Sequence, residues 1–353
     1  MRLNDKEVLA SEVYLRTLPE ASDFEPDPGE DERHVQLAIV VVTVRRVNHV
    51  NKPLGYLTRV VASVDRLIKE DRPAASRSTK MEYKTLTICN VDAGPGRHEE
   101  VQSLAALHYF HIVDRFPNGS IEATIMNPFA KEKEDYAFCL RHAIGERSPP
   151  DWILLIEDDA VPRDEIFESL RQILGRKLKM EPTSSFFKLY YPERWQGYSF
   201  ELHKILELFA IFAIGGCTLV WLGLINRRSR FLYTQANGML FVIGGAYLCL
   251  VALAIGRQHL LELRRFGTFM LQLIPAPDCC SPALLYPLPV AMTLADYLDS
   301  VRSSHISPLD NAIDSFSKLP GQSAFLVEPN LFRHVGLIST IKGFSTHLEE
   351  FLV

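Results

Sequence analysis

The sequence predicts an α/β protein with a Rossmann-like sheet that is interrupted by a two-helix transmembrane hairpin. The sheet is indicated by two apolar strands, at residues 35–44 and 152–156, in the first half of the chain. The hairpin is indicated by two uncharged apolar runs, at residues 208–225 and 236–255. The length of 353 residues suggests about two domains, since a domain commonly holds roughly 100–200 residues.

The composition is that of a globular protein, with 47% hydrophobic and 23% charged residues. The net charge of −5 provides no basic field for nucleic acid, so we expect no nucleic-acid partner. No CxxC pair occurs among the six cysteines, which argues against a zinc site or a thioredoxin-like motif. Cys279 and Cys280 are adjacent. Each is expected to pack alone or to pair with Cys89 or Cys139, and the rare alternative is a disulfide between the two neighbours.

The first part of the chain has the pattern of a right-handed βαβ unit. Residues 1–33 are polar and predict a helix at Lys6–Leu18 followed by an irregular linker. A strand at Val35–Val44, a helix at Leu54–Glu70 and a strand at Thr85–Asn90 follow, and the helix has apolar residues at helical spacing. Because the two strands of such a unit run parallel, the polar residues that end them share one edge of the sheet.

Polar side chains stand at this edge. Thr43 ends the first strand, Arg46 follows it, and Asp92 follows the second strand. A hydroxyl and basic groups in this place suit a phosphate or a nucleotide, although a basic strand end can also simply face solvent. No GxGxxG sequence accompanies the unit, so the dinucleotide fingerprint is absent.

The most informative stretch is the apolar strand Trp152–Ile156, which ends in Glu157, Asp158 and Asp159. A strand without polar alternation is typical of one buried on both faces, and ligands bind at the carboxyl ends of strands in open α/β sheets. Adjacent acids repel one another unless a cation compensates them, and a hard divalent ion that also binds substrate phosphates fits. The alternative is an acidic turn that caps a helix starting near Pro162.

Further elements complete the predicted sheet domain, and one late helix carries Asp310 in its first turn with Asp314 one turn on, on the same face. The elements are a helix at Lys131–Ile144, strands at Ser185–Tyr191 and Phe269–Leu273, helices at Thr293–Val301 and Pro308–Leu319 (the latter with Ser307 as N-cap), and a strand at Ala324–Val327.

The two apolar runs predict a membrane hairpin. At ~1.5 Å per residue they reach about 27 and 30 Å, enough to cross a hydrocarbon core of about 30 Å when neighbouring apolar residues are included. The short connection carries Arg227, Arg228 and Arg230, so the positive-inside rule places it in the cytosol and both flanks on the other side. The alternative, a buried hairpin of a soluble core, is disfavoured because neither run shows an amphipathic stripe.

An ordered set of motifs resembles one class of enzyme. In chain order the motifs are Lys131-x-x-x-Asp135-Tyr136, Glu157-Asp158-Asp159, Pro308-Leu309-Asp310 and Pro329-Asn330-Leu331-Phe332-Arg333-His334-Val335-Gly336. Over roughly residues 35–345 the set resembles the N-acetylglucosaminyltransferase IV type of GT-A glycosyltransferase. Those enzymes have no membrane hairpin inside the catalytic domain. In this feature the chain resembles the Golgi post-GPI-attachment N-acetylgalactosaminyltransferases, whose GT-A domain is split by tandem membrane helices.

The resemblance implies a GT-A domain in two parts. Residues 34–204 would bind the nucleotide and the metal, and residues 258–353 would supply the acceptor side, the catalytic base and a metal-binding histidine. Between them lies the hairpin at 205–257 with its cytosolic loop at 226–235, and residues 1–33 form the N-terminal helix and linker. Family members begin with a membrane anchor, so either this chain is trimmed or the hairpin alone anchors it.

The resemblance also implies a metal centre. Asp159, the last acid of the triplet, is expected to bind the metal directly, with His334 as the imidazole ligand. Glu157 and Asp158 are expected to contact the ribose or metal-bound water. A mixed shell of carboxylate, imidazole and phosphate favours Mn²⁺ over Mg²⁺. Without the resemblance, His334 is better explained as a core histidine.

The remaining roles are a catalytic base and contacts to the donor. An inverting displacement needs one carboxylate base, for which Asp310 holds the family position and Asp314 is the alternative. Both could instead serve helix N-terminal electrostatics. The candidate contacts to uridine and phosphates are Thr43, Arg46, Asp92, Lys131 and Asp135.

The implied reaction transfers GalNAc from UDP-GalNAc to the first mannose of a GPI glycan in the Golgi lumen. The chain would be a multi-pass Golgi membrane protein whose partners are the nucleotide-sugar donor, GPI-anchored protein acceptors and membrane lipid. A catalytic domain held close to the bilayer gains effective concentration for such an acceptor. The alternatives are a membrane-anchored N-glycan GlcNAc-transferase and a non-catalytic membrane scaffold with the same fold.

Overall fold

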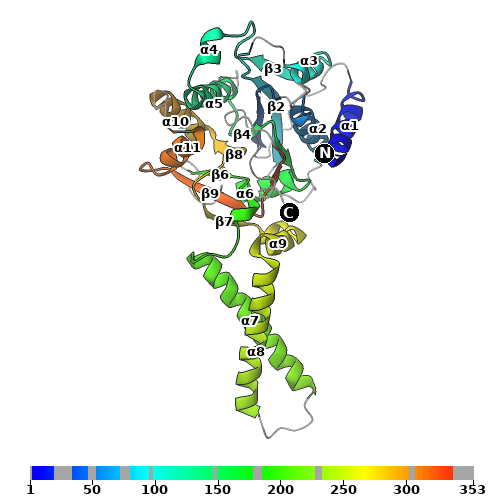
Figure 1. The fold of residues 1–353 in the computed structure, drawn as a ribbon, viewed down its shortest axis with the longest axis vertical. Helices are drawn as coiled ribbons and strands as arrows, with labels where there is room; N and C mark the ends of the chain where they lie inside the picture. The colour runs from blue at the N-terminus through cyan, green and yellow to red at the C-terminus, as the bar shows by residue number, and fades with distance from the viewer. Residues whose placement is uncertain are drawn as a thin grey trace. The chain divides into compact units, whose positions relative to one another are not determined.

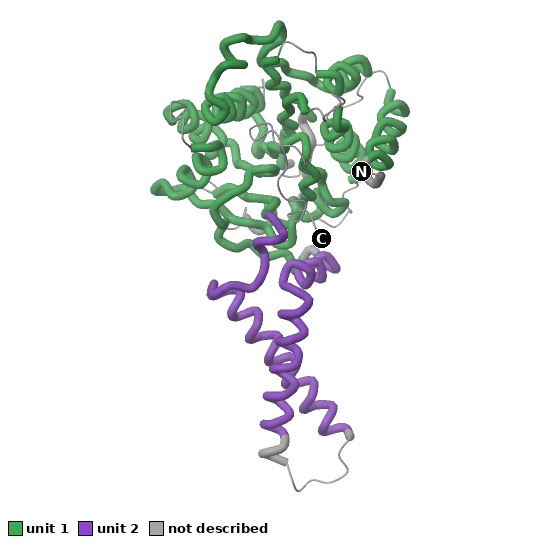
Figure 2. Tube along the Cα trace, in the orientation of Figure 1, with its two compact units in different colours: residues 1–191, 268–348 green, residues 192–267, 349–353 purple. Residues whose placement is uncertain are grey.

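The computed structural model describes residues 2–19, 34–46, 53–71, 80–94, 98–145, 149–177, 185–226, 233–301 and 307–336. The predicted linker and most of the loop between the apolar runs lie outside these residues. The chain divides into two compact units (Figure 2). Unit 1 holds Met1–Tyr191 and Thr268–Leu348, and unit 2 holds Pro192–Gly267 and Glu349–Val353. The segment Pro192–Gly267 is therefore inserted into the sequence of unit 1.

Unit 1 contains the strands, and its chain enters and leaves the insertion between two of them (Figure 1). Before the insertion the elements are α1 (Arg2–Leu15), β1 (His34–Thr43), α2 (Tyr56–Glu70), β2 (Lys80–Asn90), α3 (Glu99–Ala105), β3 (His111–Asp114), α4 (Ile121–Ile125), α5 (Pro128–Ile144), β4 (Trp152–Glu157), β5 (Ala160–Pro162), α6 (Ile166–Lys177) and β6 (Ser185–Lys188). After it they are the 3₁₀ turn η3 (Thr268–Met270), β7 (Gln272–Pro275), β8 (Ala283–Pro287), α10 (Leu288–Ser300), α11 (Leu309–Ser317), β9 (Ser323–Glu328) and β10 (Phe332–His334).

One large sheet has the strand order β3-β2-β1-β4-β8-β6-β9-β7, and β5 and β10 form a separate small sheet. The pairs β2–β3, β1–β2, β1–β4 and β6–β9 are parallel, whereas β4–β8, β6–β8 and β7–β9 are antiparallel. The predicted α/β class is confirmed, with a mostly parallel sheet. The predicted βαβ unit is confirmed as β1, α2 and β2.

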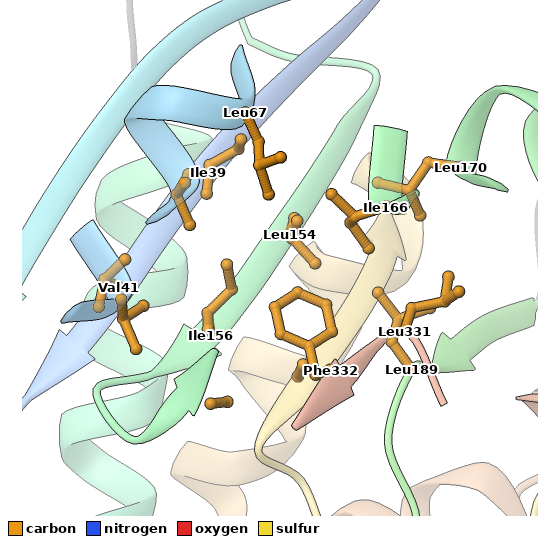
Figure 3. Close-up of a cluster of buried hydrophobic side chains, with 14 of the residues drawn as sticks. Ile39, Val41, Leu67, Leu154, Ile156, Ile166, Leu170, Leu189, Leu331 and Phe332 are labelled. Atoms are coloured by element: carbon orange, nitrogen blue, oxygen red, sulfur yellow. The ribbon is translucent and has the colours of Figure 1, made fainter. Parts of the chain in front are cut away.

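The central strands are apolar because both of their faces are covered. Ile39 and Leu154 belong to a cluster with side chains of α2 and α6, and Figure 3 shows these groups pointing toward one another. The alternate residues Val40 and Leu155 belong to a second cluster with side chains of α5, α10 and α11. Successive strand residues point to opposite faces, so an unbroken apolar strand requires helices on both sides.

The structure corrects several local predictions. The alternative interpretation of the acidic triplet, a turn that caps a helix starting near Pro162, is not what forms: Ala160–Pro162 is β5, paired with β10, and α6 begins only at Ile166. The strand expected at Phe269–Leu273 begins only at Gln272, as β7, because residues 268–270 form η3, where Phe269 is largely exposed. Ser307 does not cap α11: Pro308 is the N-cap residue, and its side chain makes no capping hydrogen bond.

The cysteines also differ from the simplest expectation. Cys89 and Cys139 form a disulfide between β2 and α5, and both are fully buried. Cys279 and Cys280 are joined to each other, which is the rarer of the two arrangements considered. The buried pair connects a strand to the helix that covers it, so it stabilises the packing of that layer.

Unit 2 consists mainly of two long helices, α7 (Leu202–Asn226) and α8 (Tyr233–Ile255), which cross each other (Figure 1). The short elements around them are η1 (Glu193–Trp195), α9 (Arg257–Leu261) and η2 (Glu262–Phe266). The stretches Leu202–Ile225 and Asn237–Ile255 are long and apolar enough to cross a membrane, and only 11% and 17% of their apolar windows are buried. The core helix of a soluble protein would be mostly buried, so these values favour a membrane hairpin.

Glycines set the crossing of α7 and α8. A Cβ added to Gly215 would lie 2.5 Å from the backbone oxygen of Gly244, and one added to Gly244 would lie 2.5 Å from the oxygen of Gly215. The ring of Phe212 packs over Gly245 in the same region. Small residues allow two membrane helices to approach until their backbones touch, which maximises packing where burial from water gives no driving force.

Candidate active site

The site lies at the carboxyl edge of the parallel strands. The register of β1 with β4 pairs Val42 with Glu157, and that of β1 with β2 pairs Thr43 with Asn90. The ends of three neighbouring strands are therefore level, which confirms that the polar strand ends share one edge. Such an edge is where open α/β sheets bind ligands.

Thr43 and Arg46 bind the acidic side chains that follow β4: Thr43 contacts Asp158, and Arg46 contacts Asp158 and Asp159. The Thr43 hydroxyl donates to Asp158 Oδ2 at 2.7 Å, and the Val44 backbone N–H donates to the same oxygen at 3.3 Å. Arg46 contacts both acids, with one guanidinium nitrogen 3.0 Å from Asp158 Oδ1 and the other against Asp159 Oδ2. Two residues that the sequence suggested as phosphate contacts thus meet the acidic triplet.

The small sheet brings His334 to Asp159. β10 runs antiparallel to β5 with His334 opposite Ala160, and the Val335 backbone N–H donates to the Asp159 carbonyl oxygen at 2.8 Å. His334 Nε2 then lies 3.3 Å from Asp159 Oδ2. Gly336 completes the turn over this carboxylate, since a Cβ there would lie 2.0 Å from Asp159 Oδ2. Only glycine fits so close to the acid.

Glu157, Asp159 and His334 could together hold a metal ion. One ligand atom from each of the three side chains lies within 4.8 Å of the others. Asp159 Oδ1 is buried and has no hydrogen-bond partner among the described residues. A buried carboxylate oxygen without a partner is costly unless a cation binds it. Two carboxylates and an imidazole suit a divalent transition metal, so the residues present fit the predicted metal.

Burial and mutual repulsion shape the protonation of the triplet. Burial raises the pKa of Asp158 to about 6, against the opposing effect of Arg46. Burial, and then the charge of Asp159, raise the pKa of Glu157 well above its usual value. Burial also disfavours the charged form of Asp159, but Arg46 and His334 outweigh it and hold its pKa well below the usual range. Asp159 is therefore the acid that stays ionised at this site.

Asp310 and Asp314 both lie on α11 but have different surroundings. The Ser281 hydroxyl donates to Asp310 Oδ1 at 2.5 Å, and Asp310 lies near enough to Glu157 to raise the pKa of that acid. Burial in turn raises the pKa of Asp310 itself. Asp314 is instead bound by the buried Lys188, whose ammonium lies 2.7 Å from its Oδ1. The structure thus separates a carboxylate beside the triplet from one that forms an ion pair.

Lys131, Asp135 and Asp92 form a second group beside the triplet's edge. The Lys131 ammonium contacts Asp135 and donates to the Val91 carbonyl oxygen at 2.8 Å. It also lies near enough to Asp92 to lower the pKa of that acid, although burial, the largest effect, raises it. Asp135 has a further ion pair with Arg115. The structure therefore brings these three predicted donor contacts together.

A model of the GPI-N-acetylgalactosamine transferase PGAP4 family matches residues 37–333. The chain belongs to this family. The match begins in β1 and ends in β10, so it spans both parts of unit 1 and the whole hairpin. It confirms the resemblance to the GPI N-acetylgalactosaminyltransferases, and family membership implies transfer of N-acetylgalactosamine to GPI.

Several residues around the family's motifs had not been predicted. Glu132 Oε2 accepts from the Leu309 backbone N–H at 3.2 Å, and so takes the capping role that the sequence assigned to Ser307. Burial raises the pKa of Glu132 to about 7, and the nearby Asp310 raises it too. Glu132 adjoins a quoted motif and could have been noticed. Lys188 had no local signal, because its partner Asp314 lies far along the chain.

Proposed function

We propose that this chain is a metal-dependent, inverting glycosyltransferase with a GT-A catalytic domain. It transfers GalNAc from UDP-GalNAc to the first mannose of GPI glycans on GPI-anchored proteins. The observation that carries the proposal is the meeting of Glu157, Asp159 and His334 at the carboxyl edge of the sheet, within a chain of the GPI-N-acetylgalactosamine transferase family. The unpartnered oxygen of Asp159 supports metal binding there.

Asp159 and His334 would bind the metal directly, and Glu157 is placed to join them. Mn²⁺ is favoured by the mixture of carboxylate and imidazole ligands, and when bound it would neutralise the charge of the leaving diphosphate. Asp158, already held by Thr43 and Arg46, is placed to contact the donor rather than the metal. Arg46 supplies a second positive charge beside the triplet for the diphosphate.

Asp310 is the proposed general base. A base must reach the acceptor hydroxyl and have a carboxylate that is free to take a proton. Asp314 is poorly suited, because Lys188 and the Cys279 backbone N–H bind its two oxygens at 2.7 and 2.6 Å. Asp310 lies near enough to Glu157 to raise the pKa of that acid, so a base at Asp310 would stand beside the proposed metal site. Asp92, Lys131 and Asp135 would contact the nucleotide from the neighbouring strand end.

The proposed location is the Golgi membrane, with the catalytic domain in the lumen. The domain comprises residues 34–204 and 258–353, and the hairpin at 205–257 places its basic loop in the cytosol. Disulfides persist in oxidising compartments such as the secretory pathway, and unit 1 contains both the Cys89–Cys139 and the Cys279–Cys280 bonds. This supports a lumenal catalytic domain and a cytosolic loop.

Purified protein with Mn²⁺ and a panel of donors tests the proposal. Transfer from UDP-GalNAc to a mannose-bearing GPI glycan should exceed transfer from UDP-GlcNAc. Preference for UDP-GlcNAc and an N-glycan acceptor would identify the alternative enzyme. Neither transfer nor nucleotide binding would identify a non-catalytic scaffold.

Two variants test the assignment of the base. Asp310→Asn should lower kcat by about 10²–10⁴-fold with UDP affinity unchanged, since a base acts only in the transition state. Asp314→Asn should instead lower the free energy of unfolding by about 3 kcal/mol or more, because it leaves the buried Lys188 ammonium without its carboxylate. Full turnover in Asp310→Asn would refute the assignment.

A further inference from the structure

The bond between Cys279 and Cys280 lies in an unusual backbone turn. The two residues have φ values of 98° and 66°, in the left-handed region that residues other than glycine rarely adopt. Each cysteine is half-buried, so the bond is within reach of solvent. In contrast, the sulfur atoms of Cys89 and Cys139 are fully enclosed in the core. The Cys279–Cys280 disulfide therefore does not cross-link the buried core.

The backbone of this turn contacts both acids of α11. The Cys279 N–H donates to Asp314 Oδ2 at 2.6 Å, and the Cys279 carbonyl oxygen accepts from the Lys188 ammonium at 2.7 Å. The Cys280 backbone N–H contributes a hydrogen bond to the Asp310 carboxylate, which also accepts from the Ser281 hydroxyl at 2.5 Å. Consecutive residues of one turn thus hold the proposed base and its neighbour.

We propose that the Cys279–Cys280 disulfide is a positioning element for Asp310. The bond joins neighbouring residues, keeps both in left-handed backbone conformations, and so keeps the Cys280 N–H and Ser281 aimed at the Asp310 carboxylate. This rests on the proposed function, in which Asp310 is the general base. The two cysteines are positioning residues, because they act through Asp310 and take no part in bond making themselves.

Opening the bond would loosen Asp310 more than the rest of the domain. Two unlinked cysteines would relax toward the ordinary backbone region, and their N–H groups would turn away from the acids. The Lys188–Asp314 ion pair does not depend on the sulfur atoms and lies 2.7 Å apart within the buried interior, so it would keep α11 in place. A base that is held in only one orientation reacts faster than one that samples several.

The test uses a double variant that carries both Cys279→Ser and Cys280→Ser, and compares it with two control variants. Cys217→Ser changes a free cysteine of α7 and controls for loss of a sulfur atom elsewhere. Ser281→Ala removes a single hydrogen bond to Asp310 without touching the disulfide. For each protein, kcat, the acceptor KM, the affinity for UDP with Mn²⁺ and the melting temperature are measured.

The double variant should lose about 10- to 100-fold in kcat, the size expected when a reacting group is misplaced, with UDP affinity and cooperative melting retained. Ser281→Ala should lose less, and Cys217→Ser should lose nothing. A small dithiol, which reduces the Cys279–Cys280 bond to two cysteine thiols and is itself oxidised to a disulfide, should reproduce the loss in the wild type and have no further effect on the double variant. Wild-type kcat in the double variant would overturn the proposal, and so would a parallel fall in UDP affinity and melting temperature.

Combining the double variant with Asp310→Asn shows whether the disulfide acts through Asp310. If it does, the combined protein should be no slower than Asp310→Asn alone, because the two changes remove the same contribution. If the fold-decreases in kcat caused by the cysteine changes and by Asp310→Asn multiply in the combined protein, the proposal is overturned, while Asp310 remains the base. Full turnover in Asp310→Asn would instead refute the proposed function at this residue.

Hydrogen exchange provides a measurement that does not depend on turnover. In the double variant, the backbone N–H groups of residues 279 and 280 should exchange faster than in the wild type, because they lose their hydrogen bonds to Asp314 and Asp310, while α11 and β1 should be unchanged. Unchanged exchange at residues 279 and 280 would overturn the positioning role. Faster exchange in a protein without transferase activity would support the positioning role and refute the proposed reaction.

Discussion

Gly336 allows the proposed metal site to be perturbed through a single added atom. A Cβ at this position would lie 2.0 Å from Oδ2 and 2.8 Å from Cγ of Asp159. The φ of Gly336 lies outside the left-handed region, so alanine meets no backbone penalty there. The three nearest described atoms to the added Cβ all belong to Asp159, so Gly336→Ala acts first on this side chain.

The size of the effect follows from what must move. Ordinary contact begins at 3.4 Å, so the new Cβ and Asp159 Oδ2 must separate by more than 1 Å. If the carboxylate turns away, it leaves Arg46 and His334, which contact the same oxygen. If the backbone lifts instead, the hydrogen bond from the Val335 N–H to the Asp159 carbonyl, 2.8 Å long, is broken. Either movement separates the proposed metal ligands.

Gly336→Ala should therefore weaken Mn²⁺-dependent UDP binding by about 10- to 100-fold, the usual result of disturbing the support of a metal ligand. Overpacking should also lower the free energy of unfolding by about 1–3 kcal/mol. Calorimetric titration of UDP with and without Mn²⁺, beside thermal unfolding, measures both effects. Gly197→Ala is the matched control, because no atom lies within 4 Å of its added Cβ. Undiminished Mn²⁺-dependent binding in Gly336→Ala would refute the metal site.

Three further outcomes are expected. Mn²⁺ affinity, followed by titration from pH 8 to pH 5, should fall as the pH falls, because burial and the charge of Asp159 raise the pKa of Glu157 and let protons compete with the metal; an affinity independent of pH would point to other ligands. Gly244→Leu should lower the melting temperature of the detergent-solubilised protein, whereas Gly238→Leu, with no atom within 4 Å of its Cβ, should not; equal effects would contradict close helix contact. Protease added to sealed microsomes should cut an epitope at Ser229, in the undescribed loop, and spare one at the C-terminus; protection of the loop would reverse the topology.

The sequence predicted the elements whose signals are local. Apolar runs marked the strands β1, β2 and β4, and apolar residues at helical spacing marked α2 between the first two. The acidic and basic residues that meet at the sheet edge stand at the ends of these strands. The start of α10 was placed too late, at Thr293 rather than Leu288, because prolines nearby suggested a loop. Pro289 instead occupies the first turn of α10, where a missing N–H costs nothing.

The contacts that could not be predicted join segments that are distant in sequence. The pairing of β5 with β10, which sets His334 beside Asp159, has no local pattern, because each strand is very short. The ion pair of Lys188 with Asp314 also depends on tertiary packing alone. The family motifs supplied His334 and Asp310 as candidates, but only the structure distinguished the surroundings of Asp310 from those of Asp314.

The segment with the two long apolar helices is inserted at one connection of the large sheet. The chain leaves unit 1 after β6 and returns before β7, the edge strand of that sheet, so the inserted segment lengthens a single connection between two strands. The entropic cost of a connection grows only slowly with its length. Asp159 and Lys188 come before the insertion, and their partners His334 and Asp314 come after it. The parts of unit 1 before and after the insertion must therefore come together before the candidate active site exists. Changes in the glycines of α7 and α8 should alter membrane anchoring without altering Mn²⁺-dependent UDP binding.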